Sequence, residues 1–240
     1  ELEQDLKQAD RLAIMGTLAA GLAHEIRNPL GGIKGAAQLL RRAVEDDATL
    51  RAYTDIMIRE SDRVNQLIEQ LLDLSRPWQL NFAPVNIHEI LEEVLLLEMH
   101  SAPGKSITVK KRFDPSLPPV KGDRAQLMQV FLNLVKNAYE AMERTGILML
   151  TTRLETDFHI RAQGRRRSRL IWVEIADDGA GIDEETLPHV FSPFFTTKNS
   201  GTGLGLATCY RIVNEHGGII RVESAKRKGT TFKVSLVVAE

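Results

Sequence analysis

The sequence predicts two unlike parts: a helical hairpin over residues 1–78 and a mixed α/β sandwich over residues 79–240. In the first part, apolar residues recur at alternating three- and four-residue steps, which is the spacing of a helical seam. In the second, helix-capping patterns are followed by runs of alternating apolar residues that are typical of strands. The length of 240 residues allows two small domains at about 100–200 residues per domain.

The first predicted helix carries its seam on Leu12, Met15, Ala19, Leu22 and Ile26. The seam resumes over residues 30–40, but a second consecutive four-residue step shifts its register beside Pro29. A proline removes a backbone hydrogen bond from a helix, and an extra four-residue step unwinds a supercoil locally. We therefore expect an irregularity at this point.

A polar break at residues 45–47 separates this helix from a second one, which ends at residues 75–77. The apolar residues of the second helix are Tyr53, Met57, Val64, Ile68 and Leu71. A two-helix hairpin cannot bury both of its seams alone. The sequence therefore predicts a two-fold homodimer in which two hairpins form a four-helix bundle.

The second part is predicted to contain helices and mostly antiparallel strands. Asn86 and Asp123 begin capping-box patterns, which predict helices over 87–100 and 124–144. Alternating apolar residues predict strands over 148–154, 171–175, 219–223 and 231–238, a hairpin loop over 157–168 and a helix over 204–215.

Composition excludes several classes of protein. The formal net charge is −1, so no overall basic field indicates a nucleic-acid partner. No run of about 18 apolar residues and no signal peptide are present, so we expect this fragment to make no membrane contact. The chain begins in the middle of a helical pattern without Met, and we interpret it as the cytoplasmic part of a longer protein whose membrane attachment stays open. The single cysteine, Cys209, excludes an internal disulfide and is expected to be a buried thiol.

His24 lies two positions from Leu22 and from Ile26, about 200° around the helix from either, so it is predicted to face away from the core. A lone exposed histidine is most often an ordinary surface residue. Here Glu25 is adjacent and Asn28 lies one turn further along the same face. A neutral imidazole is a nitrogen nucleophile, a carboxylate can take its proton, and an amide can orient a water.

Asn133 and Asn137 share one face of an otherwise apolar predicted helix. Buried amides need hydrogen-bond partners, and an amide oxygen is also a ligand that Mg²⁺ accepts when it bridges phosphates. The alternative is that both amides cap neighbouring backbone.

Two glycine-containing segments follow. Asp177 follows directly on a predicted strand, and Gly179 and Gly181 come shortly after it. This arrangement suits an adenine amine and a flat base or, alternatively, a tight acidic turn. Gly201, Gly203 and Gly205 precede a predicted helix, whose free amides suit phosphate. Neither a Walker A sequence nor a strict G-x-G-x-x-G after a strand is present.

Taken in this order, the motifs resemble the transmitter core of two-component sensor histidine kinases over essentially the whole chain. Residues 24–30 resemble the H box, 133–137 the N box, 177–182 the G1 box, 191–198 the F box and lid, and 201–206 the G2 box. The resemblance implies a dimerisation and phosphotransfer hairpin followed by a Bergerat-type ATP-binding domain.

The resemblance also implies roles for single residues. Asp177 would contact adenine, Asn137 would hold Mg²⁺, Lys198 would reach the phosphates, and Thr230 would lie on the adenine side. The implied enzyme is an ATP-dependent protein-histidine kinase that phosphorylates His24, passes the phosphoryl group to an aspartate of a response regulator, and also acts as a phosphatase.

A narrower resemblance, to the nitrogen-regulation kinases of NtrB type, lies in residues 30–40, in residues 114–118 and in the long hairpin that contains Gln163 and Gly164. It implies an NtrC-type response regulator as partner and a PII-type regulator. Two other functions stay open: a Bergerat-fold ATPase that drives a mechanical clamp, in which the His24 motif has no role, and a degenerate module that only dimerises and binds a partner.

Overall fold

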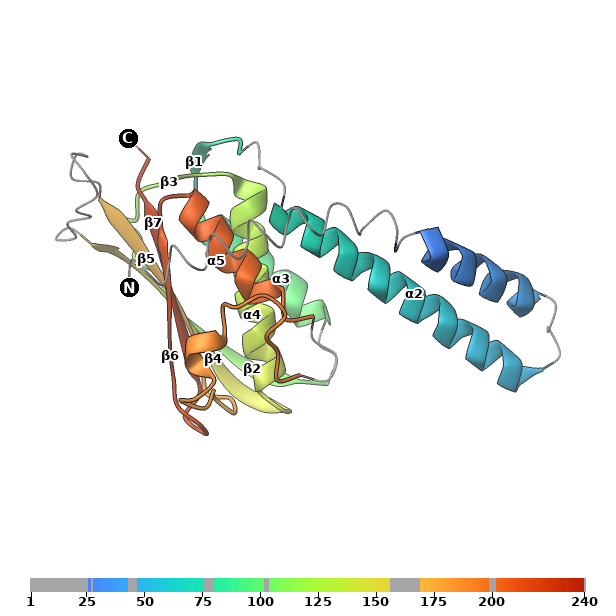
Figure 1. The fold of residues 1–240 in the computed structure, drawn as a ribbon. Coiled ribbons are helices and arrows are strands. Elements are labelled where there is room, and N and C mark those ends of the chain that lie inside the picture. The colour runs from blue at the N-terminus through green and yellow to red at the C-terminus, as the bar shows by residue number, and fades with distance from the viewer. Residues whose placement is uncertain are drawn as a thin grey trace. The chain divides into compact units, whose positions relative to one another are not determined.

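The computed structural model describes residues 26, 28–42, 47–75, 80–101, 104–155, 169–198 and 202–239. The chain divides into two compact units, Glu1–Trp78 and Gln79–Glu240 (Figure 1). His24, Glu25 and Gly201 lie outside the described residues, as do the predicted loop over 157–168 and most of the first helical seam.

The first unit is a helical hairpin, as predicted. Its described helical residues are 26 and 28–42, followed by α2 (Ala48–Ser75). Asp47 begins α2 as a cap, because its Oδ1 accepts hydrogen bonds from the backbone N–H groups of Thr49 at 2.9 Å and Leu50 at 3.0 Å. The polar break therefore ends one helix and starts the next. Pro29 lies in helical backbone. The register shift was expected in the step from Ile26 to Leu30, within which Arg27 is not described.

Two ion pairs join the helices of the hairpin. Lys34 Nζ lies 2.5 Å from Asp62 Oδ1, and Arg41 Nε lies 3.1 Å from Asp55 Oδ1. These side chains are between 33% and 50% exposed, so each pair contributes at most about 1 kcal/mol and mainly selects the pairing of the helices.

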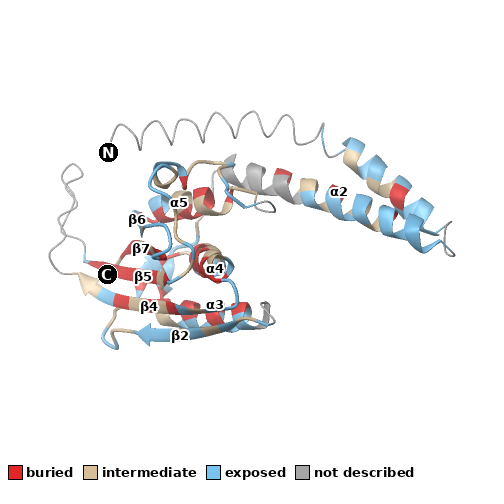
Figure 2. Ribbon diagram, turned by 90° about the horizontal axis from the view of Figure 1, so that it is seen from below, coloured by how far each residue is buried: buried red, intermediate tan, exposed pale blue. Residues whose placement is uncertain are grey.

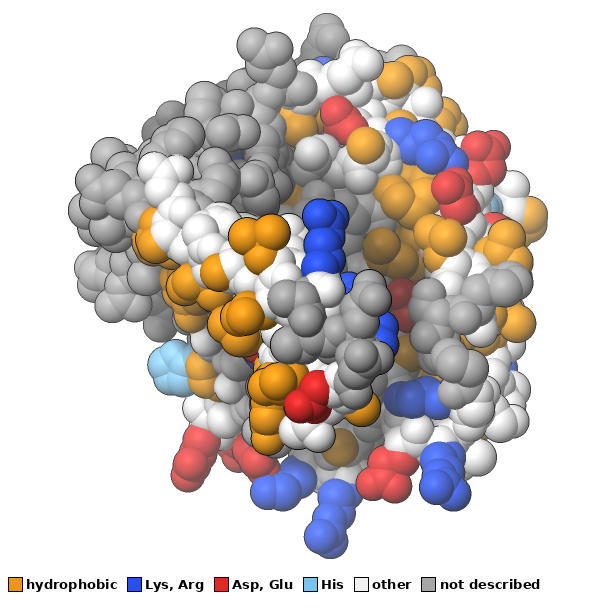
Figure 3. All heavy atoms as spheres, turned by 90° about the vertical axis from the view of Figure 1, so that its right-hand side faces the viewer, with side chains coloured by type: hydrophobic (Ala, Val, Ile, Leu, Met, Phe, Trp, Pro, Cys, Tyr) orange, Lys and Arg blue, Asp and Glu red, His pale blue; other side chains and the backbone are white. Residues whose placement is uncertain are grey.

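Among the hairpin residues whose side chains the structure describes, few apolar ones are buried within one chain. Ala37 and Ile68 are buried, and Leu30 and Val64 pack against Ile68. Most of the described hairpin residues are drawn as exposed in Figure 2, and hydrophobic side chains lie on the surface in Figure 3. The large exposed ones are Ile26, Ile33, Leu39, Leu40, Leu50, Tyr53, Ile56 and Met57. An apolar surface of this kind marks an interaction site.

The second unit is a two-layer α/β sandwich, which confirms the predicted fold class. Its five-stranded sheet has the order β2-β4-β5-β7-β6. The strands are β2 (Ser106–Arg112), β4 (Thr145–Glu155), β5 (Leu170–Asp177), β7 (Thr230–Val237) and β6 (Ile219–Ser224). Only the β2–β4 pair of this sheet is parallel, so the sheet is mostly antiparallel as predicted.

Three helices cover one face of this sheet (Figure 1): α3 (Ile87–Ser101), α4 (Arg124–Ala141) and α5 (Gly205–Glu215). The core lies between the two layers, where Figure 2 shows most of the buried residues. It includes the fully buried Phe131, Ile90, Leu91, Leu134, Leu148, Leu150 and Ile175. A short 3₁₀ helix, η1 (Leu187–His189), precedes the loop that leads to α5.

Three strands were not predicted. β1 (Ala83–Val85) and β3 (Val120–Gly122) form a separate antiparallel pair, and each has three residues, too few for an alternating pattern. β2 is an edge strand that ends in Lys110, Lys111 and Arg112. Charged residues protect an exposed edge from pairing with other chains, but they also conceal the strand pattern.

Two local predictions need correction. The helix predicted to reach residue 144 ends at Ala141, because β4 begins at Thr145. The capping box at Asp123 is only half formed: Asp123 accepts from the N–H groups of Ala125 and Gln126, whereas the buried Oε1 of Gln126 has no hydrogen-bond partner within the described part of the chain.

Candidate nucleotide-binding site

One face of α4 is contacted along its length by the start of α5, by the loop before α5 and by the loop after β5. Asn133 lies beside Gly205 at the start of α5, where a Cβ added to Gly205 would be 3.8 Å from the Asn133 amide. Asn137, one turn further, contacts Lys198 of the loop before α5. At the end of the helix, Ala141 O accepts a hydrogen bond from the N–H of Ala180, 3.1 Å away. The predicted glycine and lysine segments therefore meet the predicted asparagine helix.

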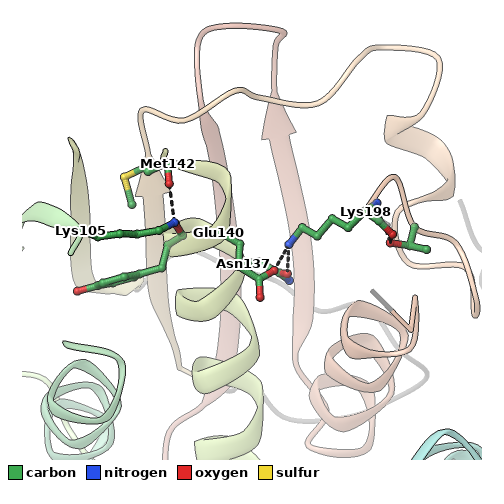
Figure 4. Close-up of polar contacts among 7 residues, drawn as sticks. Lys105, Asn137, Glu140, Met142 and Lys198 are labelled. Carbon is green, nitrogen blue, oxygen red and sulfur yellow. Dashed lines mark hydrogen bonds and ion pairs between the residues drawn. The ribbon is translucent and has the colours of Figure 1, made fainter. Parts of the chain in front are cut away.

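Lys198 reaches α4 with its ammonium group. Its Nζ donates to Asn137 Oδ1 at 3.0 Å and also forms an ion pair with Glu140, as Figure 4 shows. Asn137 and Glu140 lie three positions apart and so project from the same helix face. Glu140 was not predicted as a site residue, although its spacing from Asn137 was a signal that could have indicated it.

Asp177 is the last residue of β5 and is buried. Its Oδ1 accepts from the N–H of Gly179 at 2.9 Å. Burial raises the pKa of this carboxyl, while hydrogen bonds from the backbone of Gly179 and Thr230 lower it, and the net shift is upward. A buried carboxylate at a strand end is an acceptor held in one place, which suits recognition of an amine.

The neighbouring Asp178 has a different environment. It is exposed, and its Oδ1 accepts from the N–H of Ile147 at 2.8 Å. Asp178 thus joins the loop after β5 to the adjacent strand β4. Of the two consecutive aspartates, only Asp177 is buried.

The glycines of the loop after β5 pack against backbone of this chain. A Cβ on Gly179 would lie 2.6 Å from Ala141 O, and one on Gly181 would lie 2.1 Å from Ala225 O. Gly181 also has a φ of +70°, which glycine adopts without strain. Close packing within the protein therefore accounts for both glycines, a role that sequence analysis did not assign to them.

Gly203 closes the 192–203 loop. It has a φ of +69°, and a Cβ there would lie 2.4 Å from the backbone carbon of Phe194. Phe194 itself has a φ of +64°. The two ends of the loop are therefore in contact, and Lys198 lies between them in sequence.

Thr230 begins β7 directly opposite Asp177 in the strand register. It is buried, and its Oγ1 lies 3.0 Å from Ser224 Oγ. Ser224 Oγ also accepts from the N–H of Ile182 at 2.8 Å. Thr230 is thus held next to the candidate adenine-binding carboxylate, and Ser224 connects it to the loop after β5.

Lys105 stabilises the end of α4 and was not predicted, because no local pattern marks it. Its Nζ donates to the carbonyl oxygens of Tyr139 at 2.5 Å and Met142 at 2.7 Å (Figure 4). The last carbonyls of a helix lack partners within the helix, and a cation there also complements the helix dipole. Lys105 thereby fixes the helix end against which the loop after β5 packs.

Cys209 is a fully buried thiol on α5, as expected. Its Sγ donates to Val130 O at 3.7 Å, and burial raises the pKa of the thiol to about 12. A thiol with so high a pKa is not a nucleophile at neutral pH.

The donor set around Asn137 fits a divalent cation that is held mainly by a nucleotide. Asn137 already presents its amide oxygen to a positive charge, the Lys198 ammonium. Within the described ranges, no group of three or more His, Cys, Asp or Glu residues is placed to hold a metal ion. Mg²⁺ is characteristically bound by one or two protein oxygens, with phosphates and waters completing its shell.

Of the three predicted catalytic residues, the structure describes only Asn28, which is helical and exposed. His24 and Glu25 lie outside the described residues, as does Gly201 of the glycine segment. None of the described helices is both long and apolar enough to cross a bilayer.

Two families match the chain. Residues 14–77 match the His Kinase A (phospho-acceptor) domain, and residues 122–240 match the histidine kinase-, DNA gyrase B- and HSP90-like ATPase family. The first match contains His24, and the second contains Asn133, Asn137, Asp177 and Lys198.

Among curated proteins, the chain is 43% identical over 221 residues to the sensory histidine kinase/phosphatase NtrB of Rhizobium leguminosarum bv. phaseoli. The match covers 90% of this chain and 57% of NtrB, so the chain spans little more than half the length of that relative.

Solved structures of histidine kinases are also similar to this chain. The catalytic domain of the histidine kinase ThkA is 32% identical, with a TM-score of 0.56, and the match covers 67% of this chain and 99% of that domain. ThkA in complex with the response regulator protein TrrA is 30% identical, with a TM-score of 0.67 and coverage of 99% of this chain and 66% of ThkA.

Full-length ShkA in complex with AMPPNP is 26% identical, with a TM-score of 0.71. The match covers 93% of this chain and 46% of the ShkA chain. The helical hairpin, the α/β sandwich, the two family matches and these likenesses all agree: the chain belongs to the histidine kinases and contains their phospho-acceptor domain and their ATP-binding domain.

Proposed function

We propose that this chain is a homodimeric, Mg²⁺-dependent protein-histidine kinase that phosphorylates its own His24 and then an aspartate of a response regulator. In this proposal, residues 1–78 form the dimerisation and phosphotransfer hairpin, and residues 79–240 form the catalytic domain. The observation that carries it is the convergence on α4, where Asn133 faces Gly205 and Asn137 receives Lys198.

The nucleotide would be bound by residues that the fold has brought together. Asp177 would accept from the adenine amine, with Thr230 beside it, and Lys198 would pair with the phosphates. The backbone of the glycine segment 201–205 at the start of α5 would approach the phosphates. Mg²⁺ bound with the nucleotide would neutralise phosphate charge, and Asn137 would hold it.

The chemistry of the chain's own residues follows from their types. A ring nitrogen of His24 attacks the γ-phosphorus, the bond from that phosphorus to the oxygen of ADP breaks, and ADP leaves. Glu25 takes the ring proton as the nitrogen–phosphorus bond forms. Asn28, which is helical and exposed, orients a water for the hydrolysis of the phosphorylated partner. The kinase/phosphatase name of the NtrB relative supports both activities.

The exposed apolar surface of the hairpin supports the homodimer. Tyr53 and Met57, which belong to the predicted seam, are 59% and 40% exposed in one chain. A second hairpin would cover such residues in a four-helix bundle.

The partner is proposed to be a response regulator, and the ThkA–TrrA complex supports this class of partner. The similarity to NtrB supports an NtrC-type regulator, a PII-type protein upstream and a role in nitrogen regulation. An ATPase clamp is not favoured, because the match to the phospho-acceptor domain over residues 14–77 has no role in a clamp.

The test is incubation with radiolabelled ATP, followed by a panel of receiver domains. We expect acid-labile label on the wild-type chain, transfer of that label to a receiver domain, and no label on His24→Gln. The variant should retain its affinity for ATP. Acid-labile label retained by His24→Gln would refute the assignment of the phospho-acceptor.

A further inference from the structure

The ammonium group of Lys198 is held between two oxygens of α4. Asn137 Oδ1 lies 3.0 Å from Nζ, and the Glu140 carboxylate forms an ion pair with the same atom (Figure 4). The side chains of Lys198 and Glu140 are 40% and 42% exposed, so a ligand can reach this place from solvent. Two oxygens from adjacent turns of one helix thus hold a positive charge.

These two oxygens have the chemistry of a site for a divalent cation. Amide and carboxylate oxygens are the ligands that hard cations such as Mg²⁺ prefer.

Lys198 has two roles that exclude each other once a metal ion occupies these oxygens: pairing with Asn137 and Glu140, or pairing with the phosphates of a nucleotide. An ammonium and a metal ion would repel each other at one pair of oxygens. The proposed function gives Lys198 the second role, whereas the structure shows the first. The exchange costs little, because an ion pair between largely exposed side chains contributes little to stability. When Lys198 leaves, an amide oxygen and a carboxylate stay behind, and these are ligands that a divalent cation prefers.

We propose that Asn137 and Glu140 form a cation subsite with two alternative occupants: the Lys198 ammonium in the nucleotide-free chain and the divalent cation of a metal–nucleotide in the bound chain. The subsite rests on the proposed function and assigns Glu140 to the binding of the metal. Glu140 acts directly on the cation, and its ion pair with Lys198 belongs to the nucleotide-free state.

The experiment measures the dissociation constant of ADP for the 240-residue chain by calorimetry, once with excess Mg²⁺ and once with a chelator. The ratio of the two constants gives the contribution of the metal. In Glu140→Gln this contribution should fall about five-fold, because the metal loses a charged ligand and metal-free ADP loses a repulsive neighbour. Glu143→Gln, an exposed glutamate just beyond α4, is the matched control and should leave the ratio unchanged.

A second pair of variants separates an effect on the metal from one that acts through Lys198. The Glu140→Gln effect on the ratio should persist when Lys198→Gln is already present. If the effect disappears in that background, Glu140 acts only as the partner of Lys198, and the subsite is overturned. An unchanged ratio in Glu140→Gln also overturns it. If the wild-type chain binds no ADP under either condition, the proposed function fails together with the subsite.

Discussion

Nε2 of His216 lies 3.0 Å from the backbone nitrogen of Asp123 and accepts its hydrogen bond. The other ring nitrogen, Nδ1, lies 2.7 Å from Ile212 O and donates to it. His216 is therefore neutral, with its proton on Nδ1. Phe82 contacts the same ring edge-on at 5.2 Å between centroids. The end of α5, the start of α4 and the segment before β1 thus meet at one buried histidine.

This contact predicts a loss of stability in mild acid. Burial lowers the pKa of His216, with opposing effects from Ile212, Asp123 and Glu215. The unfolded chain therefore binds the proton more readily than the folded chain. The contribution of His216 is complete above about pH 6.5 and is lost as the pH falls below it, by at most about 1.4 kcal/mol per pH unit.

The measurement is urea unfolding of wild type and His216→Gln at about pH 7.5 and about pH 5.5. The free energy of unfolding should fall less between the two conditions in the variant. Protonation of His88, whose pKa is also lowered by burial, contributes to the fall in the free energy of unfolding that remains in the variant. His189→Gln, an exposed histidine of η1, should behave like wild type. An equal fall in His216→Gln and wild type would contradict the prediction.

Asp177→Asn should weaken nucleotide binding without unfolding the domain. The amide oxygen can still accept from Gly179, but an amide also presents a donor where the adenine amine needs an acceptor. Loss of a hydrogen bond to a charged group costs about 1.5–3 kcal/mol, or about ten- to a hundred-fold in the ATP dissociation constant. Asp178→Asn is the control, because Asp178 is exposed and contacts Ile147 instead. Equal losses in both variants would refute the assignment of Asp177 to adenine.

Two neighbouring glycines should respond differently to alanine: one substitution should destabilise the domain and the other should not. Gly203→Ala should lower the free energy of unfolding by more than about 1 kcal/mol, because its φ is +69° and the new Cβ would meet the Phe194 backbone. Gly205→Ala meets only the Asn133 amide at 3.8 Å and lies in a helix, so it should be neutral or stabilise by up to about 1 kcal/mol. Urea unfolding of the two variants checks both expectations. Comparable destabilisation would mean that space at residue 205 is tighter than these contacts indicate.

Glu25 and Asn28 should affect different reactions. Glu25→Gln removes the proton acceptor beside His24 and should slow autophosphorylation by about 10²–10⁴-fold. Asn28→Ala should largely spare autophosphorylation and impair dephosphorylation of the response regulator. Parallel rates of the two reactions in each variant test this separation. Matched losses in both reactions would indicate that the substitutions disturb the helix.

The sequence by itself determined the features that depend on neighbours in the chain. Helix periodicity, the polar break closed by Asp47, the strands β4 to β7 and the asparagine, aspartate and glycine motifs are local patterns of this kind. These local patterns were sufficient to predict the two-part fold and most of the candidate site.

Only the tertiary structure decided which distant groups meet. Lys198 and Glu140 are 58 residues apart, and Asp123 and His216 are 93 apart. The parallel pairing of the charged edge strand β2 with β4 is likewise set by packing and not by its own pattern. The energy of such contacts depends on the partners that the fold brings within a few ångströms, and no local spacing contains that information.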